Sequence, residues 1–76
     1  MAKKDEFKYE IVADHGEISE SKGWSKRLRT VKWGDNDPKY DVRPWKEDGE
    51  EIRMGKGMTF TEEELRALAK LVEEVL

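Results

Sequence analysis

Apolar and polar residues alternate in the first part of the chain and change to a helical spacing near its end. In residues 6–13, EFKYEIVA, the side chains of Phe7, Tyr9 and Ile11 fall on one side, with charged residues between them. This period of two is typical of a strand that buries one face. The Gly16 that follows predicts a turn.

Three further segments have the composition of strands. Residues 24–33 and 39–45 are rich in β-branched and aromatic residues, and the run GDNDP between them is made of turn formers. Residues 52–60 predict a fourth strand. Its two glycines, Gly55 and Gly57, indicate a bulge or a close approach of another backbone.

Alternation alone does not decide which face of the middle strands is the inner one, because neither face of residues 24–33 is purely apolar. We expect Leu28 and Thr30 to face the core, and Trp24 shares their side of the strand. Tyr40 is expected to be buried. Pro44 predicts a break or bulge near the end of its strand, because proline cannot donate to the ladder.

The last sixteen residues, TEEELRALAKLVEEVL, predict a helix with a wide apolar stripe. Thr61 and Glu64 have the spacing of a capping box. A single small sheet would leave part of the stripe uncovered, so we expect a homodimer; the alternative is that the stripe packs on its own sheet. The expected interface residues are Leu65, Leu68, Leu71, Val72 and Val75. The fold class is α+β, a four-stranded antiparallel sheet followed by one C-terminal helix.

Composition limits what this chain can be. Its 76 residues, 1–76, are expected to form one domain with a small core, and the absence of cysteine excludes disulfides. No apolar run approaches the length of a membrane span, and the N-terminus lacks the apolar region of a signal peptide. We therefore expect a soluble, cytoplasmic protein.

The charge distribution is more informative than the net charge of −3. Residues 22–46 contain eight basic and three acidic residues, whereas the rest of the chain contains seven basic and fifteen acidic ones. Three tryptophans, Trp24, Trp33 and Trp45, lie in the basic segment. A basic segment with interleaved aromatic residues favours a polyanionic partner.

Catalysis is not expected. The single histidine, His15, excludes a Cys/His zinc site, and no activated nucleophile accompanies it. We interpret His15 as a solvated turn residue. The GKG at 55–57 lacks the frame of a phosphate-binding loop, and the EDGEE segment lacks EF-hand spacing. We expect no metal, no cofactor and no small-molecule substrate.

Binding of single-stranded nucleic acid is better supported. If the 34–38 turn pairs its two flanking strands, five side chains share one face: Arg27, Arg29, Trp33, Arg43 and Trp45. We expect Arg43 and Trp45 on the solvent side, where indoles stack on bases and guanidiniums meet phosphates. Alternatively, Trp33 and Trp45 form core or cross-strand contacts that only brace the sheet.

Several ordered motifs resemble the positive cofactor 4 family of single-stranded-DNA-binding coactivators, and most closely its small bacterial, YdbC-like branch. They are Asp41-Val42-Arg43-Pro44-Trp45, Asp48-Gly49-Glu50 and Lys56-Gly57-Met58-Thr59-Phe60-Thr61. The resemblance implies a homodimer of curved ββββα protomers that binds single-stranded DNA with little sequence preference. It implies that Arg43 meets phosphate, whereas the stacking aromatic falls at Trp45 or at the position of Lys46.

The sequence thus predicts a nucleic-acid-binding protein of the nucleoid, acting in transcription, replication or repair. The candidate binding residues are Lys26, Arg27, Arg29, Trp33, Lys39, Arg43, Trp45, Lys46 and Lys56. Two alternatives remain open. One is a protein-interaction module that uses the acidic helix and exposed aromatic residues, and the other is a single-stranded RNA-binding protein.

Overall fold

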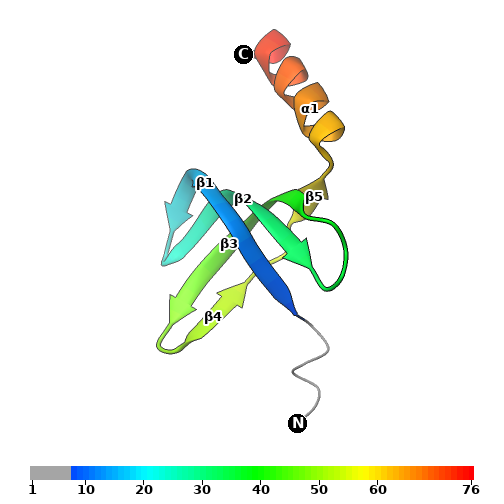
Figure 1. Cartoon of the computed structure of the whole chain (residues 1–76). Coiled ribbons are helices and arrows are strands. Elements are labelled where there is room, and N and C mark those ends of the chain that lie inside the picture. The colour runs from blue at the N-terminus through cyan, green and yellow to red at the C-terminus, as the bar shows by residue number, and fades with distance from the viewer. Residues whose placement is uncertain (1–7) are drawn as a thin grey trace.

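The computed structural model describes residues 8–76, so the predicted strand positions Glu6 and Phe7 lie outside the described range. Five strands form one antiparallel sheet in the order β1-β2-β3-β4, with β5 also paired to β3, and one helix follows (Figure 1). The predicted α+β architecture is confirmed. The elements are β1 (Tyr9–Ser21), β2 (Trp24–Trp33), β3 (Lys39–Asp48), β4 (Glu51–Met54), β5 (Met58–Phe60) and α1 (Glu62–Val75).

The first strand is longer than the alternation predicted. The turn expected at Gly16 is wrong, because β1 continues to Ser21 while its register with β2 shifts at three points. Such bulges let one strand carry extra residues without ending the ladder. His15 therefore lies in a strand rather than a turn, with its Nε2 hydrogen-bonded to Oγ1 of Thr30 at 2.7 Å.

The third and fourth strands also differ from the prediction. Pro44 does not break β3, which continues to Asp48, and its carbonyl accepts a hydrogen bond from the Gly55 backbone N–H at 2.9 Å. The predicted strand 52–60 is divided into β4 and β5 by the segment between Met54 and Met58. The division lets both short strands pair with β3.

Gly57 confirms the close backbone approach that its position indicated. A Cβ at this residue would lie 2.9 Å from Cα of Arg43 and still closer to the carbonyl oxygen of Val42. Gly55 is nearly as confined, because its Cβ would lie 2.8 Å from Cγ of Pro44. The two glycines thus allow the chain to lie directly against β3.

The sheet is strongly curved. Trp45 pairs with Ser25, which is eight residues from Trp33 on β2, or about 26 Å along an extended strand. Nevertheless the ring of Tyr9 lies 5.6 Å from that of Trp33 and 5.7 Å from that of Trp45. In Figure 1, β1 crosses in front of β3 at a steep angle. Curvature has therefore brought the first strand over the third.

The core lies on the concave face, opposite to the side expected from Leu28 and Thr30. Among the described residues, Val31 and Trp45 are the buried apolar side chains, at 0% and 4% exposure. Tyr40, which was expected to be buried, is only half-buried. The reason is that curvature encloses one face of β2 and β3 and opens the other.

The helix begins as predicted and then leaves the sheet. The backbone N–H of Glu64 donates to Oγ1 of Thr61 at 3.1 Å, and the Thr61 N–H donates to the Glu64 carboxylate at 2.9 Å. Within residues 8–76, α1 contacts only β3 and β5, and it projects from one end of the sheet (Figure 1). It is neither long nor apolar enough to cross a membrane.

We expect Gly57→Ala to destabilise the protein by about 3 kcal/mol, the upper end of the usual cost of overpacking, because the colliding atoms belong to the β3 backbone. The measurement is urea unfolding followed by tryptophan fluorescence. Lys56→Ala is the control, since Lys56 is exposed and its replacement should change the free energy of unfolding by less than about 0.5 kcal/mol. Equal stability of the two variants would contradict the packing argument.

Candidate nucleic-acid interface

The register of β2 with β3 gathers five of the candidate side chains on the concave face. Arg27 lies opposite Arg43, Arg29 opposite Asp41, and Ser25 opposite Trp45. Because side chains alternate between the faces of a strand, the odd-numbered residues of β2 share this face with the odd-numbered residues of β3. The face-sharing expected for Arg27, Arg29, Trp33, Arg43 and Trp45 is therefore confirmed.

Each of the two indoles is covered by an arginine of the same chain. The guanidinium carbon of Arg43 lies 4.6 Å from the ring centre of Trp33, and that of Arg29 lies 4.7 Å from the ring centre of Trp45. Cation–π contacts of this length hold both groups in place. The expectation that Trp45 faces solvent is wrong, because the curved sheet encloses it; the half-buried Trp33 keeps an accessible part.

A buried carboxylate fixes the position of Arg43. Asp41 is fully buried, and Nε of Arg43 donates to its two carboxylate oxygens at 2.8 and 3.0 Å. A buried charge is stable only when it is paired, so this contact constrains both side chains. The outer part of the guanidinium is then held over Trp33.

A second carboxylate, from β1, joins the other two arginines. Oδ2 of Asp14 accepts hydrogen bonds from Nε of Arg27 at 2.8 Å and from Nε of Arg29 at 2.9 Å. Desolvation acts to raise the pKa of Asp14, but the hydrogen bonds and positive charges of the two arginines outweigh it and hold this pKa below its ordinary value. Asp14 is therefore ionised at neutral pH.

These contacts change the charge that the sequence predicted for this face. Glu17 adds a third carboxylate, 3.9 Å from Nη1 of Arg27. Asp14, Glu17 and Asp41 thus balance the three arginines of the concave face in formal charge. The basic segment of the sequence is folded against acidic residues, two of which come from outside it.

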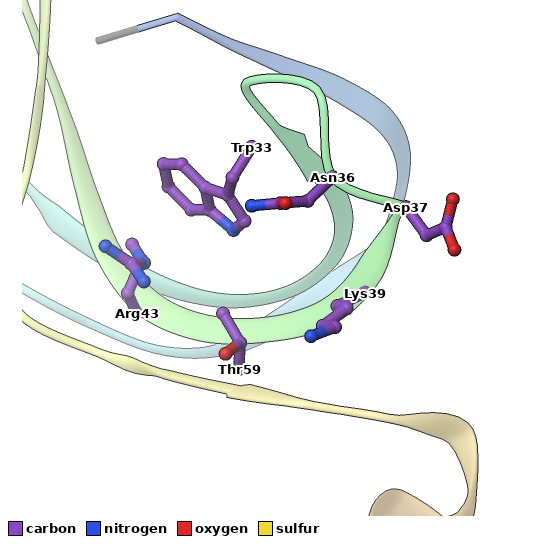
Figure 2. A pocket seen from close by; sticks show the side chains of 6 residues that line it. All are labelled: Trp33, Asn36, Asp37, Lys39, Arg43 and Thr59. Carbon is purple, nitrogen blue, oxygen red and sulfur yellow. The ribbon is translucent and has the colours of Figure 1, made fainter.

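A groove opens beside Trp33 at one end of the concave face. It measures about 360 Å³ and is lined by Trp33, Asn36, Asp37, Lys39, Arg43 and Thr59; we call it the Trp33 groove. Figure 2 shows the Asn36 amide directed toward the indole, whereas Asp37 points away from it. The groove therefore combines a flat aromatic wall, an amide and two cations, which suits a planar base with an attached phosphate.

A second groove, of about 530 Å³, lies toward the other end of β2 and β3. We call it the Arg27 groove; Arg27, Arg29 and Ser25 are among its lining residues. Nη1 of Arg27 donates to Oγ of Ser25 at 3.0 Å, and this hydroxyl donates to Glu17 at 2.6 Å. The Arg27 groove therefore presents a hydrogen-bonded polar wall.

The candidate lysines are spread over several places. Lys39 lines the Trp33 groove, and Lys46 lines the Arg27 groove with its Nζ 5.8 Å from the ring centre of Trp24. Lys26 is exposed on the opposite, convex face, beside Pro44 in the register. Lys56 is exposed between β4 and β5. The structure thus brings Lys39 and Lys46 to the grooves, but not Lys26.

Sequence reasoning missed three contributors to this face, Asn36, Thr59 and Asp14. Asn36 and Thr59 were assigned to a turn and a strand without a role, although their neighbours Trp33 and Lys56 were singled out. No sequence pattern identified Asp14, because the bulges of β1 decide on which face of the sheet its side chain lies. Within the described residues 8–76, no three acidic, histidine or cysteine side chains gather in a way that could hold a metal ion.

Comparison with known proteins identifies the family. The family model for Transcriptional Coactivator p15 (PC4) matches residues 20–71. A protein of Treponema pallidum (strain Nichols), described as uncharacterized, is 39% identical over 72 residues, which cover 93% of this chain and 82% of that protein. Proteins of the matched family are non-enzymatic and bind single-stranded DNA, which agrees with the expectation that this chain is no enzyme. The chain belongs to the PC4 family.

Proposed function

We propose that this protein is a homodimer that binds single-stranded DNA on its concave faces, with little sequence preference, in the cytoplasm of a bacterium. Family membership suggests single-stranded DNA as the ligand class. The observation that carries the proposal for this chain is the Trp33 groove, where an indole, an arginine and a lysine line one open space. We further propose that the chain belongs to the small bacterial branch of the family.

The Trp33 groove supplies the two interactions that single strands need. A base entering it would stack on the accessible part of Trp33, and base stacking on an aromatic side chain contributes about 1–3 kcal/mol. Lys39 is exposed at the same groove and can neutralise the phosphate that follows. Because every base has a π-face, this mode of capture has little sequence preference.

The strand would continue along the concave face toward the Arg27 groove. Arg27 and Arg29 can donate to successive phosphates there. Lys46 borders this groove, but its Nζ lies by Trp24 on the convex face, so Lys46 is assigned only a peripheral contribution. Lys26 and Lys56 are assigned a peripheral, long-range contribution, since they are exposed away from both grooves. Trp45 acts indirectly: it holds the guanidinium of Arg29 and the curvature of the sheet.

The proposed dimer is supported by the exposure of the apolar side chains of α1 in the single chain. No residue of α1 is buried, and Leu71 and Val75 are 57% and 79% exposed. An apolar groove of about 350 Å³ runs along this side of the helix. The radius of gyration is 13.9 Å, against about 11 Å for a compact chain of this length. A second copy would cover the stripe and complete the small core.

The first test is fluorescence anisotropy of a labelled dT oligomer of about 20 nucleotides, at low and physiological salt, with a matched duplex and an rU oligomer in parallel. We expect tight, salt-sensitive binding to the single strand and much weaker binding to the duplex. Trp33→Ala should weaken binding by about 5- to 150-fold, the loss of one stacked base.

Trp24→Ala is the matched control, because Trp24 lies on the convex face and its loss should leave affinity nearly unchanged. Circular dichroism checks that both variants remain folded. Equal affinities of the two variants would remove Trp33 from the binding site. A wild-type chain that binds no single strand at low salt would overturn the proposed function, and preference for rU over dT would redirect it to RNA.

Lys39→Gln should reduce the steepness with which affinity falls as salt is raised. Each phosphate contact on a single strand contributes about 0.7 to the slope of log affinity against log salt, so the variant should lose about that amount. Lys70→Gln removes the same charge from the exposed surface of α1 and should leave the slope unchanged. Identical slopes for the two variants would show that Lys39 contacts no phosphate.

Leu68→Glu should dissociate the dimer, as measured by sedimentation equilibrium. In a two-fold symmetric dimer the substitution occurs once in each copy. Losing both leucines should therefore weaken the free energy of dimerisation by about 3 kcal/mol or more, which raises the dissociation constant by over about 100-fold. Lys70→Glu introduces the same side chain on the opposite side of α1 and should remain dimeric. A monomeric wild-type chain, or two dimeric variants, would contradict the helix interface.

A further inference from the structure

The contact between Asp14 and the two arginines of the Arg27 groove has a geometry that phosphate would share. One oxygen, Oδ2 of Asp14, accepts from Nε of both Arg27 and Arg29 at 2.8 and 2.9 Å. Guanidinium groups bind carboxylate and phosphate oxygens through the same charge-assisted hydrogen bonds. The carboxylate therefore occupies a place suited to a phosphate oxygen.

We propose that Asp14 is an internal competitor for the phosphates of single-stranded nucleic acid, and that it keeps Arg27 and Arg29 occupied until a bound strand displaces it. This inference rests on the proposed function, since it concerns the regulation of the same binding face. It explains why a segment that is strongly basic in sequence presents a face whose formal charges are balanced.

Displacement of Asp14 is feasible because its side chain is held at the rim rather than in the core. It is 33% exposed, and ion pairs of partly exposed side chains are weak, because solvent screens them. The register of β1 shifts immediately after Asp14. The buried pair of Asp41 and Arg43 is different, because there the carboxylate has no access to solvent and stays paired.

Arg27 and Arg29 are also partly accessible where they would meet a strand. Their side chains are 27% and 17% exposed, and both line the Arg27 groove. Among the described residues Arg29 donates only through Nε, so its two Nη groups remain available for a phosphate. A phosphate that also takes the Nε bonds must replace Asp14, and this exchange lowers the net gain of binding.

A purely structural role for Asp14 makes the opposite prediction. If the carboxylate merely positioned the two guanidiniums, its removal would disorder them and weaken nucleic-acid binding. If it competes, its removal strengthens binding. The sign of the change in affinity therefore separates the two roles.

The test compares Asp14→Asn with Glu10→Gln by anisotropy of the labelled dT oligomer, at several salt concentrations between about 50 and about 200 mM. Asparagine retains Oδ1, which accepts from the Gly16 N–H at 3.0 Å, but loses the charge and the second acceptor oxygen. Glu10 lies on the same strand, opposite Lys32, and is exposed, so Glu10→Gln reproduces the change in net charge without touching the arginines.

We expect Asp14→Asn to bind about fivefold more tightly than wild type at low salt, the equivalent of one partly exposed ion pair. The slope of log affinity against log salt should steepen by about 0.7 for each additional phosphate contact. Glu10→Gln should change affinity by less than about twofold, because solvent and salt screen an exposed charge. In an Arg27→Gln background, the gain from Asp14→Asn should shrink.

Thermal unfolding verifies that each variant is folded before its affinity is compared. If wild type binds and Asp14→Asn binds no more tightly than Glu10→Gln, the competition is overturned while the proposed function stands. A gain that persists unchanged in the Arg27→Gln background would also overturn it, since the two guanidiniums would not be its cause. If none of the chains binds the oligomer, the proposed function fails and this inference fails with it.

Discussion

The burial of Trp45 is the interaction on which the rest of this protein depends. Its ring lies 5.7 Å from Tyr9 of β1 and 4.7 Å from the guanidinium of Arg29 on β2, so one side chain of β3 ties three strands together. A flat sheet could not make these contacts, because the strand positions involved would be too far apart. The indole therefore stabilises the curvature, and the curvature creates the concave face and its two grooves.

The same curvature determines the electrostatics of the face. Arginines that would be solvated on a flat sheet are brought beside carboxylates of β1 and β3, where solvent screens their interactions less. Asp41 holds Arg43 against Trp33, and Asp14 joins Arg27 to Arg29. The side chains of this face are consequently held in position, but their formal charges are balanced. A polyanion would therefore bind by replacing a carboxylate at an arginine, and not by attraction to a surface with excess positive charge.

The exposed helix shows that a single chain leaves much of its apolar surface unburied. A core that contains two buried apolar side chains among the described residues is small for any stable domain, and α1 adds none of its own. Within one chain, the apolar stripe of α1 therefore stays exposed to solvent and contributes little to stability. A symmetric dimer through α1 would let each copy supply what the other lacks, and it would set two concave faces in a fixed relation.

Local patterns in the sequence determined most of the elements and the face on which each side chain lies within its own strand. Capping residues specified the start of α1. Alternation within each strand, together with the turn formers of residues 34–38 between the strands, specified that Arg27 and Arg43 share one face with Trp33. Both depend only on neighbours in the chain, because helical and extended backbones have fixed periods. The two tightly packed glycines were recognisable for the same reason: a residue without a side chain inside a strand signals close contact.

Only the tertiary structure decided which face is inside and which charges meet. The sequence predicted Trp45 at the surface, and it is enclosed because the bulged β1 curls over β3. Asp14 is 13 residues from Arg27 and 15 from Arg29, so no local period relates them. Curvature accumulates over many small twists and bulges, and it is set by the packing of the whole sheet. For that reason the residue types of the interface could be read from the sequence, but its charge balance could not.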